Sequence, residues 1–403
     1  MVVFFLSFCN INSVYLSNQD KLLFMSFFLS ALIAGACFLL LYIILLNVKK
    51  VNVIANKWFA GFIFCLLVLT SVTILIESKT ISESSIIVDG LSVFIFLISP
   101  FFYFSITYFI KPTTNWKHLN HLHFWLSYFY LFLFILSLFL DENPKVEDVS
   151  QNTVDVANYI LASIVSIQVF TYCFLSYKKI VEHQKNILLY RSTTENIDLG
   201  WLKKISLAVI IMGFFFATDL LFQLSEKFIL FDIFTNFLYL ITIMYITFFW
   251  LKQEEIYPYS IAEKNEIISI IEESNLVEDK KKKLISDENL DKIKSELLKL
   301  METEKPFLDS ELNLVKLANK MNLSSHLLSY IINNGFEENF FQFINRYRIE
   351  EAKKLILNPK MNYLSLLGIG FEVGFNSKTV FNTTFKKITG KTPSEYKKNS
   401  SDL

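Results

Sequence analysis

The sequence has little of what disulfide frameworks, metal sites and enzyme active sites require. Its four cysteines, Cys9, Cys37, Cys65 and Cys173, are far apart and form no C-x-x-C pair, which indicates neither disulfides nor a zinc site. No phosphate-binding glycine loop, H-E-x-x-H motif or nucleophile elbow occurs. The sequence therefore predicts a protein that is not an enzyme and that holds no cofactor and no metal.

Two further absences concern the membrane. The apolar residues 1–9 lack a basic region and a small-residue cleavage site, so no removable signal peptide is expected. No paired half-helices interrupted by Gly or Pro repeat along the chain, which disfavours a transporter with internal symmetry. His118, His121 and His123 could together bind a metal, but a place at the membrane interface, beside two tryptophans, explains them more simply.

What the sequence does have is a large excess of apolar residues in its first 250 positions. Apolar residues make up 53% of the chain, with 42 Phe and 18 Tyr, against about 45–50% in soluble domains. The remainder is charged and reads as water-soluble. We therefore expect three parts: a transmembrane domain (1–251), a cytoplasmic helical linker (252–302) and a soluble C-terminal domain (303–403).

Seven stretches are long enough to cross a bilayer, which takes about 20 apolar residues per helix. They are residues 22–46, 58–76, 88–110, 119–140, 156–177, 202–224 and 228–250. The connections after the first, third and fifth stretches hold eleven Lys or Arg, whereas the other connections and the residues before the first stretch hold four. Because basic residues stay inside, we expect a multi-pass protein of the inner (cytoplasmic) membrane with its N-terminus outside and its C-terminal domain cytoplasmic.

Polar residues within these stretches are candidates for a ligand site, because they are costly in lipid. The simpler interpretation is that they form hydrogen bonds between neighbouring helices. The residues concerned are Gln168, Tyr172, Asp219, Gln223 and Asn236.

The linker contains two short amphipathic stretches, residues 263–273 and 287–302. In the second, Leu290, Ile293, Leu297 and Leu300 fall at heptad positions a and d. Two heptads do not establish a coiled coil. The stripe is therefore either the seam of a homodimer or a face that packs on the following domain.

From residue 307 onward the apolar pattern predicts a helix-turn-helix unit. Leu314, Leu317, Ala318 and Met321 mark one buried face, and Ser324 is a good N-cap for a second helix over residues 325–334. Its open face is expected to hold Ser325, His326, Ser329, Tyr330 and Asn333. A long helix over residues 339–357, stopped by Pro359, follows.

A second unit repeats this pattern. Gly374 suits a left-handed turn residue, and a helix is expected over residues 377–389. Phe381, Phe385 and Ile388 should face inward, and Lys378, Thr379, Asn382, Thr383 and Lys386 should face outward. Between residues 378 and 398 there are six lysines and one glutamate, a balance expected of a surface that faces phosphates.

Several motifs in this region resemble the C-terminal signature of AraC/XylS-type transcription regulators. They are Gly374-Phe375-Asn376-Ser377, Phe381, Phe385-Lys386-Lys387, Gly390 and Thr392-Pro393-Ser394-Glu395-Tyr396-Lys397, and residues 345–352 resemble the family's linker helix. The resemblance covers about the last 100 residues. The whole plan resembles the membrane-bound regulators of that family, and it implies an all-α fold: a seven-helix transmembrane bundle followed by two helix-turn-helix units joined by a long helix.

The resemblance implies that two recognition helices enter successive major-groove segments of double-stranded DNA, about 34 Å apart. The implied function is a sequence-specific transcription regulator whose membrane domain senses an unknown small-molecule or membrane signal. The implied DNA-binding residues are His326, Ser329, Tyr330 and Asn333 in the first helix and Lys378, Thr379, Asn382, Thr383, Lys386 and Lys387 in the second.

Three features depart from the family's pattern. Thr383 stands where the family usually has Arg, and Gly368 and Gly370 stand where it usually has Ala. The glycine after the first recognition helix is displaced, and Glu337 and Glu338 would repel phosphates if they faced DNA. Two alternatives follow: a helix-turn-helix that serves as a protein-interaction module on a membrane scaffold, and a transporter with a regulatory tail.

Overall fold

The computed structural model describes residues 18–46, 52–82, 85–111, 121–139, 151–194, 197–210, 229–253, 267, 269–271 and 284–401. These residues form helices and no strands, which confirms the all-α prediction. The chain divides into two compact units. One comprises Met1–Ile180 and Gly200–Glu254, and the other comprises Val181–Leu199 and Glu255–Leu403.

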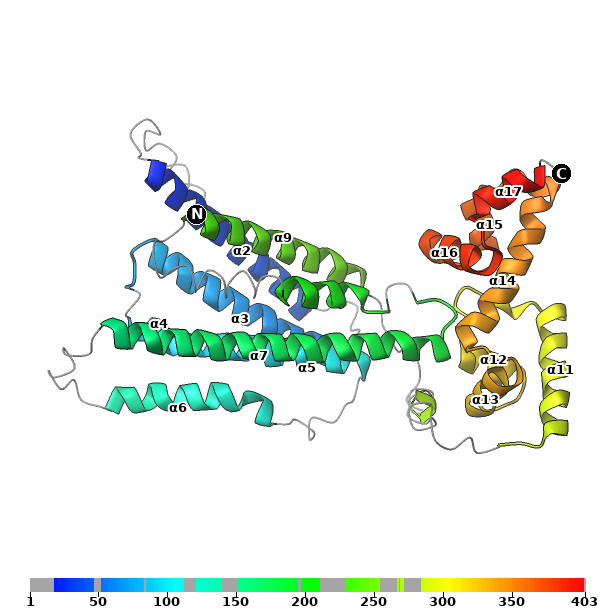
Figure 1. Ribbon diagram of the computed structural model, residues 1–403, viewed down its shortest axis with the longest axis horizontal. Coiled ribbons are helices and arrows are strands. Elements are labelled where there is room, and N and C mark those ends of the chain that lie inside the picture. The colour runs from blue at the N-terminus through cyan, green and yellow to red at the C-terminus, as the bar shows by residue number, and fades with distance from the viewer. Residues whose placement is uncertain are drawn as a thin grey trace. The chain divides into compact units, whose positions relative to one another are not determined.

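The first unit is a set of long apolar helices that lie at the expected stretches, although α2 and α3 begin four and five residues earlier than expected and α7 ends nine residues later. They are α2 (Asn18–Leu46), α3 (Val53–Glu77), α4 (Ile86–Leu91), α5 (Val93–Ile110), η2 (His121–Phe124), α6 (Trp125–Phe139), α7 (Gln151–Asn186, entering the second unit after Ile180) and α9 (Ile229–Lys252). Residues 200–210 are also helical, and the rest of the stretch expected at 202–224, with Asp219 and Gln223, lies outside the described residues. In Figure 1, α3 runs beside α2 and α5, and α9 packs on α2.

Six helices among the described residues have the length and apolar composition to cross a membrane. Their surfaces expose large apolar side chains, such as Leu45 at 67% and Phe132 at 60%. A surface of this kind is unusual for a protein surrounded by water and suits a lipid environment.

The polar side chains within the apolar helices make contacts between helices. Gln168 Nε2 donates to Phe96 O at 3.0 Å, and Asn236 Nδ2 donates to Ser26 Oγ at 3.2 Å. Tyr172 donates to His123 O at 3.2 Å, and its hydroxyl is 2.8 Å from His123 Nδ1. These bonds agree with the simpler interpretation of the polar residues. Among the residues described, no group of three His, Cys, Asp or Glu is placed to hold a metal ion, and His118 lies outside them.

The second compact unit of the chain contains two helix-turn-helix motifs and the long helix between them. The first consists of α12 (Leu314–Lys320) and α13 (Ser325–Gly335), and the second of α15 (Leu366–Glu372) and α16 (Lys378–Thr389). They are joined by α14 (Phe340–Leu357) and η6 (Pro359–Met361), and α17 (Pro393–Ser401) follows. Figure 1 shows α15, α16 and α17 gathered around α14, as their contacts require.

Side-chain caps fix where these helices begin. Ser324, Ser365 and Ser377 each accept a hydrogen bond from a backbone N–H in the first turn of α13, α15 and α16. Asn339 and Gln342 form a capping box at the start of α14. One buried cluster, formed by α14, α15, α16 and the turn before α16, consists of Ile349, Ala352, Ile356, Ile369, Val373, Phe375, Phe381 and Phe385.

The second linker stretch forms helix α11 (Asp287–Thr303), which is capped by Ser286. Leu297 and Met301 are fully buried, and Leu290 and Lys294 lie against Gly335 of α13. Of the two interpretations of the apolar stripe, these contacts favour packing on the following domain.

This packing predicts that Leu297→Ala lowers the free energy of unfolding of the second unit by about 3 kcal/mol, because it leaves a cavity. Leu300→Ala, at a half-buried position of the same helix, should cost less than half as much. Limited proteolysis of the full chain in urea measures both. A dimer seam would instead give an unfolding midpoint that changes with protein concentration.

Candidate nucleic-acid interface

Helix α13 presents a narrower open face than its sequence suggested. Leu328, Ile331 and Ile332 are buried as expected, but Ser325 and Ser329 are only 2% and 8% exposed. The prediction that these two serines lie on the open face is therefore wrong. The reason is that α11, α12 and α14 all pack against α13, so its buried arc is wider than that of a helix with one neighbour.

The remaining predicted residues of α13 reach the surface. Asn333 is exposed, and His326 and Tyr330 are half-buried. Asn333 Nδ2 donates to Ser329 Oγ at 3.3 Å, so the buried Ser329, one helical turn earlier, orients the Asn333 side chain. Asn334 is also exposed and donates to Tyr330 O at 2.9 Å. Exposure alone would have added Asn334 to the candidates, although its amide is already bonded within the helix.

Helix α16 presents a polar face opposite two buried rings. Phe381 and Phe385 are 1% and 0% exposed, and they contact each other and the neighbouring Phe375 and Tyr396 rings. On the other side, the exposed residues are Lys378, Thr379, Thr383, Lys386 and Lys387, and Asn382 is half-buried. Ile388, which was expected to face inward, is 41% exposed. It lies in the last turn of the helix, just before the left-handed Gly390.

The hydroxyl of Thr383 bonds back to its own helix, because Oγ1 donates to Thr379 O at 2.8 Å. A short side chain in this position does not extend beyond the helix surface. The longer Lys386 and Lys387 follow in the last turn and are exposed. Two of the three lysines of this helix therefore lie in its last turn, and Lys378 lies at its start.

The turn before α16 depends on Gly374. Its φ is +95°, and a Cβ atom there would lie 2.5 Å from Phe307 O and 2.9 Å from Arg348 Nε. Arg348, fully buried, donates from Nε to Phe307 O at 2.7 Å and from Nη2 to Asp309 O at 2.8 Å. Because Gly374 has no Cβ atom, the turn before α16 can approach the backbone at Phe307, which precedes α12.

Arg348 remains charged in this buried position. Burial lowers the pKa of Arg348 to about 10, and the nearby Asp309 and Glu311 oppose this shift. The side chain also stacks on the Phe375 ring at 5.6 Å. One buried cation therefore links the backbone at 307–309, which precedes α12, to the turn that precedes α16.

Glu338 is occupied by an ion pair within the domain. Its carboxylate accepts hydrogen bonds from Arg346 Nε at 2.9 Å and Nη2 at 3.0 Å, and this bonding raises the pKa of Arg346. The charge of Glu338 is therefore balanced by the charge of Arg346. Glu337 is exposed, and its φ of 55° is left-handed. The unusual backbone of this turn thus falls on Glu337 and not on Gly335.

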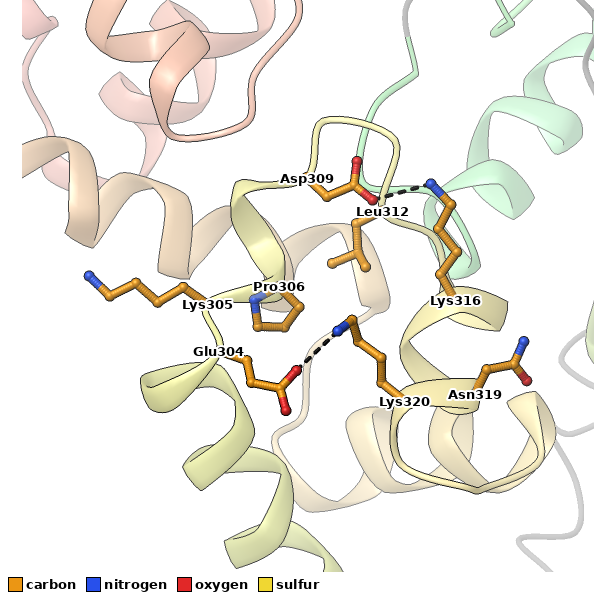
Figure 2. A pocket seen from close by; sticks show the side chains of 8 residues that line it. All are labelled: Glu304, Lys305, Pro306, Asp309, Leu312, Lys316, Asn319 and Lys320. Carbon is orange, nitrogen blue, oxygen red and sulfur yellow. Dashed lines mark hydrogen bonds and ion pairs between the residues drawn. The ribbon is translucent and has the colours of Figure 1, made fainter.

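A pocket of about 500 Å³ lies beside α12 and is shown in Figure 2. Its lining includes two ion pairs, Lys316 with Asp309 at 3.2 Å and Lys320 with Glu304 at 3.0 Å. These charges are largely paired with each other. None of the predicted DNA-binding residues lines the pocket.

Comparison with known proteins supports the assignment of the C-terminal part as a helix-turn-helix domain. Residues 317–399 match a family described as a helix-turn-helix domain. A curated relative, the Msm operon regulatory protein of Streptococcus mutans serotype c, is 33% identical over 89 residues, which is 22% of this chain and 31% of that protein. This chain thus matches less than a third of its relative's length. No solved structure matches the chain significantly.

The C-terminal part of the chain is an AraC-type helix-turn-helix domain. The AraC-type domain confirms the resemblance seen in the sequence, including its two units and the long helix between them. It supports DNA binding and transcription regulation as the general function of this part. The residues that touch DNA stay a prediction.

The close approach at Gly374 predicts a large loss of stability on substitution. Gly374→Ala should lower the free energy of unfolding of the AraC-type domain by about 3 kcal/mol, because the new methyl group would overlap Phe307 O and strain the turn. Gly390→Ala is the matched control, since Gly390 is also left-handed, with φ +77°, but has no atom within 4 Å of its Cβ position. It should cost about 1 kcal/mol. Equal losses on urea-dependent proteolysis would contradict the packing described for Gly374.

Proposed function

We propose that this protein is a membrane-embedded, sequence-specific DNA-binding transcription regulator. The observation that carries the proposal is the face of α16, where exposed lysines and polar side chains lie opposite Phe381 and Phe385. In this arrangement Phe381 and Phe385 anchor α16 to the core and leave its polar side open, as a helix that enters the major groove requires.

The proposed contacts divide into two kinds. Lys378, Lys386 and Lys387 supply charge for phosphates, and Asn382 has the amide geometry that reads adenine. Thr379 and Thr383 lie on the same face of α16. From α13 the readers would be His326, Tyr330 and Asn333. Ser329 is retained only as the residue that orients Asn333.

We further propose that the chain has three functional parts, with the transmembrane domain at 1–251, the linker at 252–302 and the DNA-binding domain at 303–403. The six apolar helices support a membrane part. In this proposal it lies in the inner membrane and senses a small molecule or a state of the bilayer. The buried Leu297 supports a linker that packs on the DNA-binding domain rather than one that forms a homodimer.

DNA contact is tested with the full chain and with genomic fragments recovered by the wild type. Lys386→Ala should weaken binding to all fragments and reduce the salt-dependent slope by about one unit, because one phosphate contact is lost. Asn382→Ala should instead relax preference at one base pair, at a cost of about 1–3 kcal/mol. Lys299→Ala, an exposed lysine on α11, is the control and should leave both unchanged.

Orientation in the membrane is tested with reporters that are active only in the cytoplasm. A fusion after Lys252 should be active, and a fusion after Glu142 should be inactive, because basic connections remain inside. The reverse pattern would exclude a transcription regulator, since DNA is accessible only on the cytoplasmic side.

A second candidate function is a protein-interaction module on a membrane scaffold. The observation that favours it is Thr383, whose hydroxyl bonds to its own helix instead of reaching outward. Thr383→Arg distinguishes the two functions. It should tighten DNA binding if the domain docks as a regulator, whereas a folded domain that binds no DNA at low salt even with this change would favour the interaction module.

A further inference from the structure

A short segment from the middle of the sequence forms part of the C-terminal unit. Residues 190–193 follow α7 and η4 (Ile187–Leu189), and they precede the helical residues that begin at 200. Tyr190, Arg191, Ser192 and Thr193 are all at most 6% exposed. They belong to the same compact unit as the AraC-type domain, although about 120 residues separate them from its first helix-turn-helix unit.

The segment pairs with the backbone that leads into α12. Leu314 N donates to Tyr190 O at 3.0 Å, Arg191 and Asn313 form an antiparallel bridge, and Ser192 Oγ donates to Leu312 O at 2.6 Å. Asn313 is also the N-cap of α12, because its Oδ1 accepts from Lys316 N at 2.8 Å. The segment therefore holds the start of the first helix-turn-helix unit.

Ser192 also completes the surroundings of the buried Arg348. Its carbonyl oxygen accepts from Arg348 Nη1 at 3.3 Å and from Asn345 Nδ2 at 3.1 Å, and its hydroxyl oxygen accepts from Arg348 Nη2 at 3.1 Å. Both residues lie on α14. Without Ser192 each terminal nitrogen of the fully buried guanidinium would lose one acceptor, leaving Asn345 Oδ1 for Nη1 and Asp309 O for Nη2. Losing hydrogen bonds is costly for a buried charged group.

We propose that residues 190–193 are an internal ligand of the AraC-type domain, through which the membrane part controls DNA binding. The segment is covalently continuous with apolar helices on both sides in the sequence. It also contacts the entry to α12 and the helix α14 that joins the two helix-turn-helix units. A displacement of the segment would therefore remove contacts that hold the start of α12 and helix α14, and so would change how the first helix-turn-helix unit is held relative to the second helix-turn-helix unit. The coupling to DNA rests on the proposed function, whereas the docking of the segment does not.

The test uses the full chain in lipid nanodiscs and measures two quantities for each variant. Hydrogen exchange of peptides covering residues 309–321 reports docking, because the Leu314 amide is protected by Tyr190 O. Salt-dependent binding to genomic DNA fragments reports function. Ser192→Lys, which places a second cation against Arg348, should raise exchange at least about tenfold and weaken DNA binding about tenfold, equivalent to about 1.4 kcal/mol. Exchange in α16 should stay unchanged.

Two further variants keep the result decisive. Thr194→Lys adds the same charge two residues later, at a half-buried position, and should behave as the wild type. Ser192→Ala removes only the hydroxyl and should shift both quantities in the same direction by a smaller factor. If Ser192→Lys also raises exchange throughout α16, the domain has unfolded and Ser192→Ala decides the outcome.

The possible failures can be told apart. Unchanged exchange at residues 309–321 in the Ser192 variants that keep α16 protected would overturn docking. Raised exchange with unaltered DNA affinity would overturn the coupling while leaving docking intact. A wild-type chain that binds no DNA would overturn the proposed function, and the coupling with it, and the exchange data would still decide whether the segment docks.

Discussion

The buried guanidinium of Arg348 is the interaction on which the rest of the C-terminal unit depends. It donates to the backbone at Phe307 and Asp309, to Asn345 on its own helix and to Ser192 from the middle of the sequence. Arginine has five N–H donors in a fixed planar fork, so each partner must occupy a set position. Burying such a charge is tolerated only when its donors are satisfied. The turn at Gly374 must then pass close to it without a Cβ atom.

Helix positions in this unit could be predicted from the sequence because their signals are local. The serines at 324, 365 and 377 and the asparagine at 339 cap the helices that follow them, and the apolar period of each helix identifies its buried side. The predicted bounds of α13, α14 and α16 were accordingly correct to within one residue. The apolar stretches of the first unit could also be located, because their length and composition distinguish them, but their ends were off by up to nine residues because apolar content alone does not mark where a helix begins or ends.

The features that could not be predicted depend on partners far away in the sequence. Ser329 was placed on an open face because a helical wheel counts only its own residues, whereas α11, α12 and α14 cover α13 from several directions. Arg348 resembled any charged residue of a long helix, since its acceptors lie at positions 192, 307 and 309. Residues 190–193 carried no local signal at all. Glu338 seemed repulsive toward phosphates because its partner, Arg346, becomes visible only in the folded turn.

The docking of residues 190–193 also bears on how the proposed regulator would act on DNA. One route by which a membrane-anchored regulator would reach DNA is release of its soluble domain by cleavage. Here a cut between the last apolar helix and α11 would free the C-terminal domain only if Ser192 also left its place beside Arg348 and Leu312. The released domain would then contain a buried cation without two of its acceptors, and its first helix-turn-helix unit would lack the backbone pairing at Leu314. If the segment docks and controls DNA binding as proposed, the intact chain is the form best able to bind DNA, and the packing of the domain favours regulation by the uncut protein.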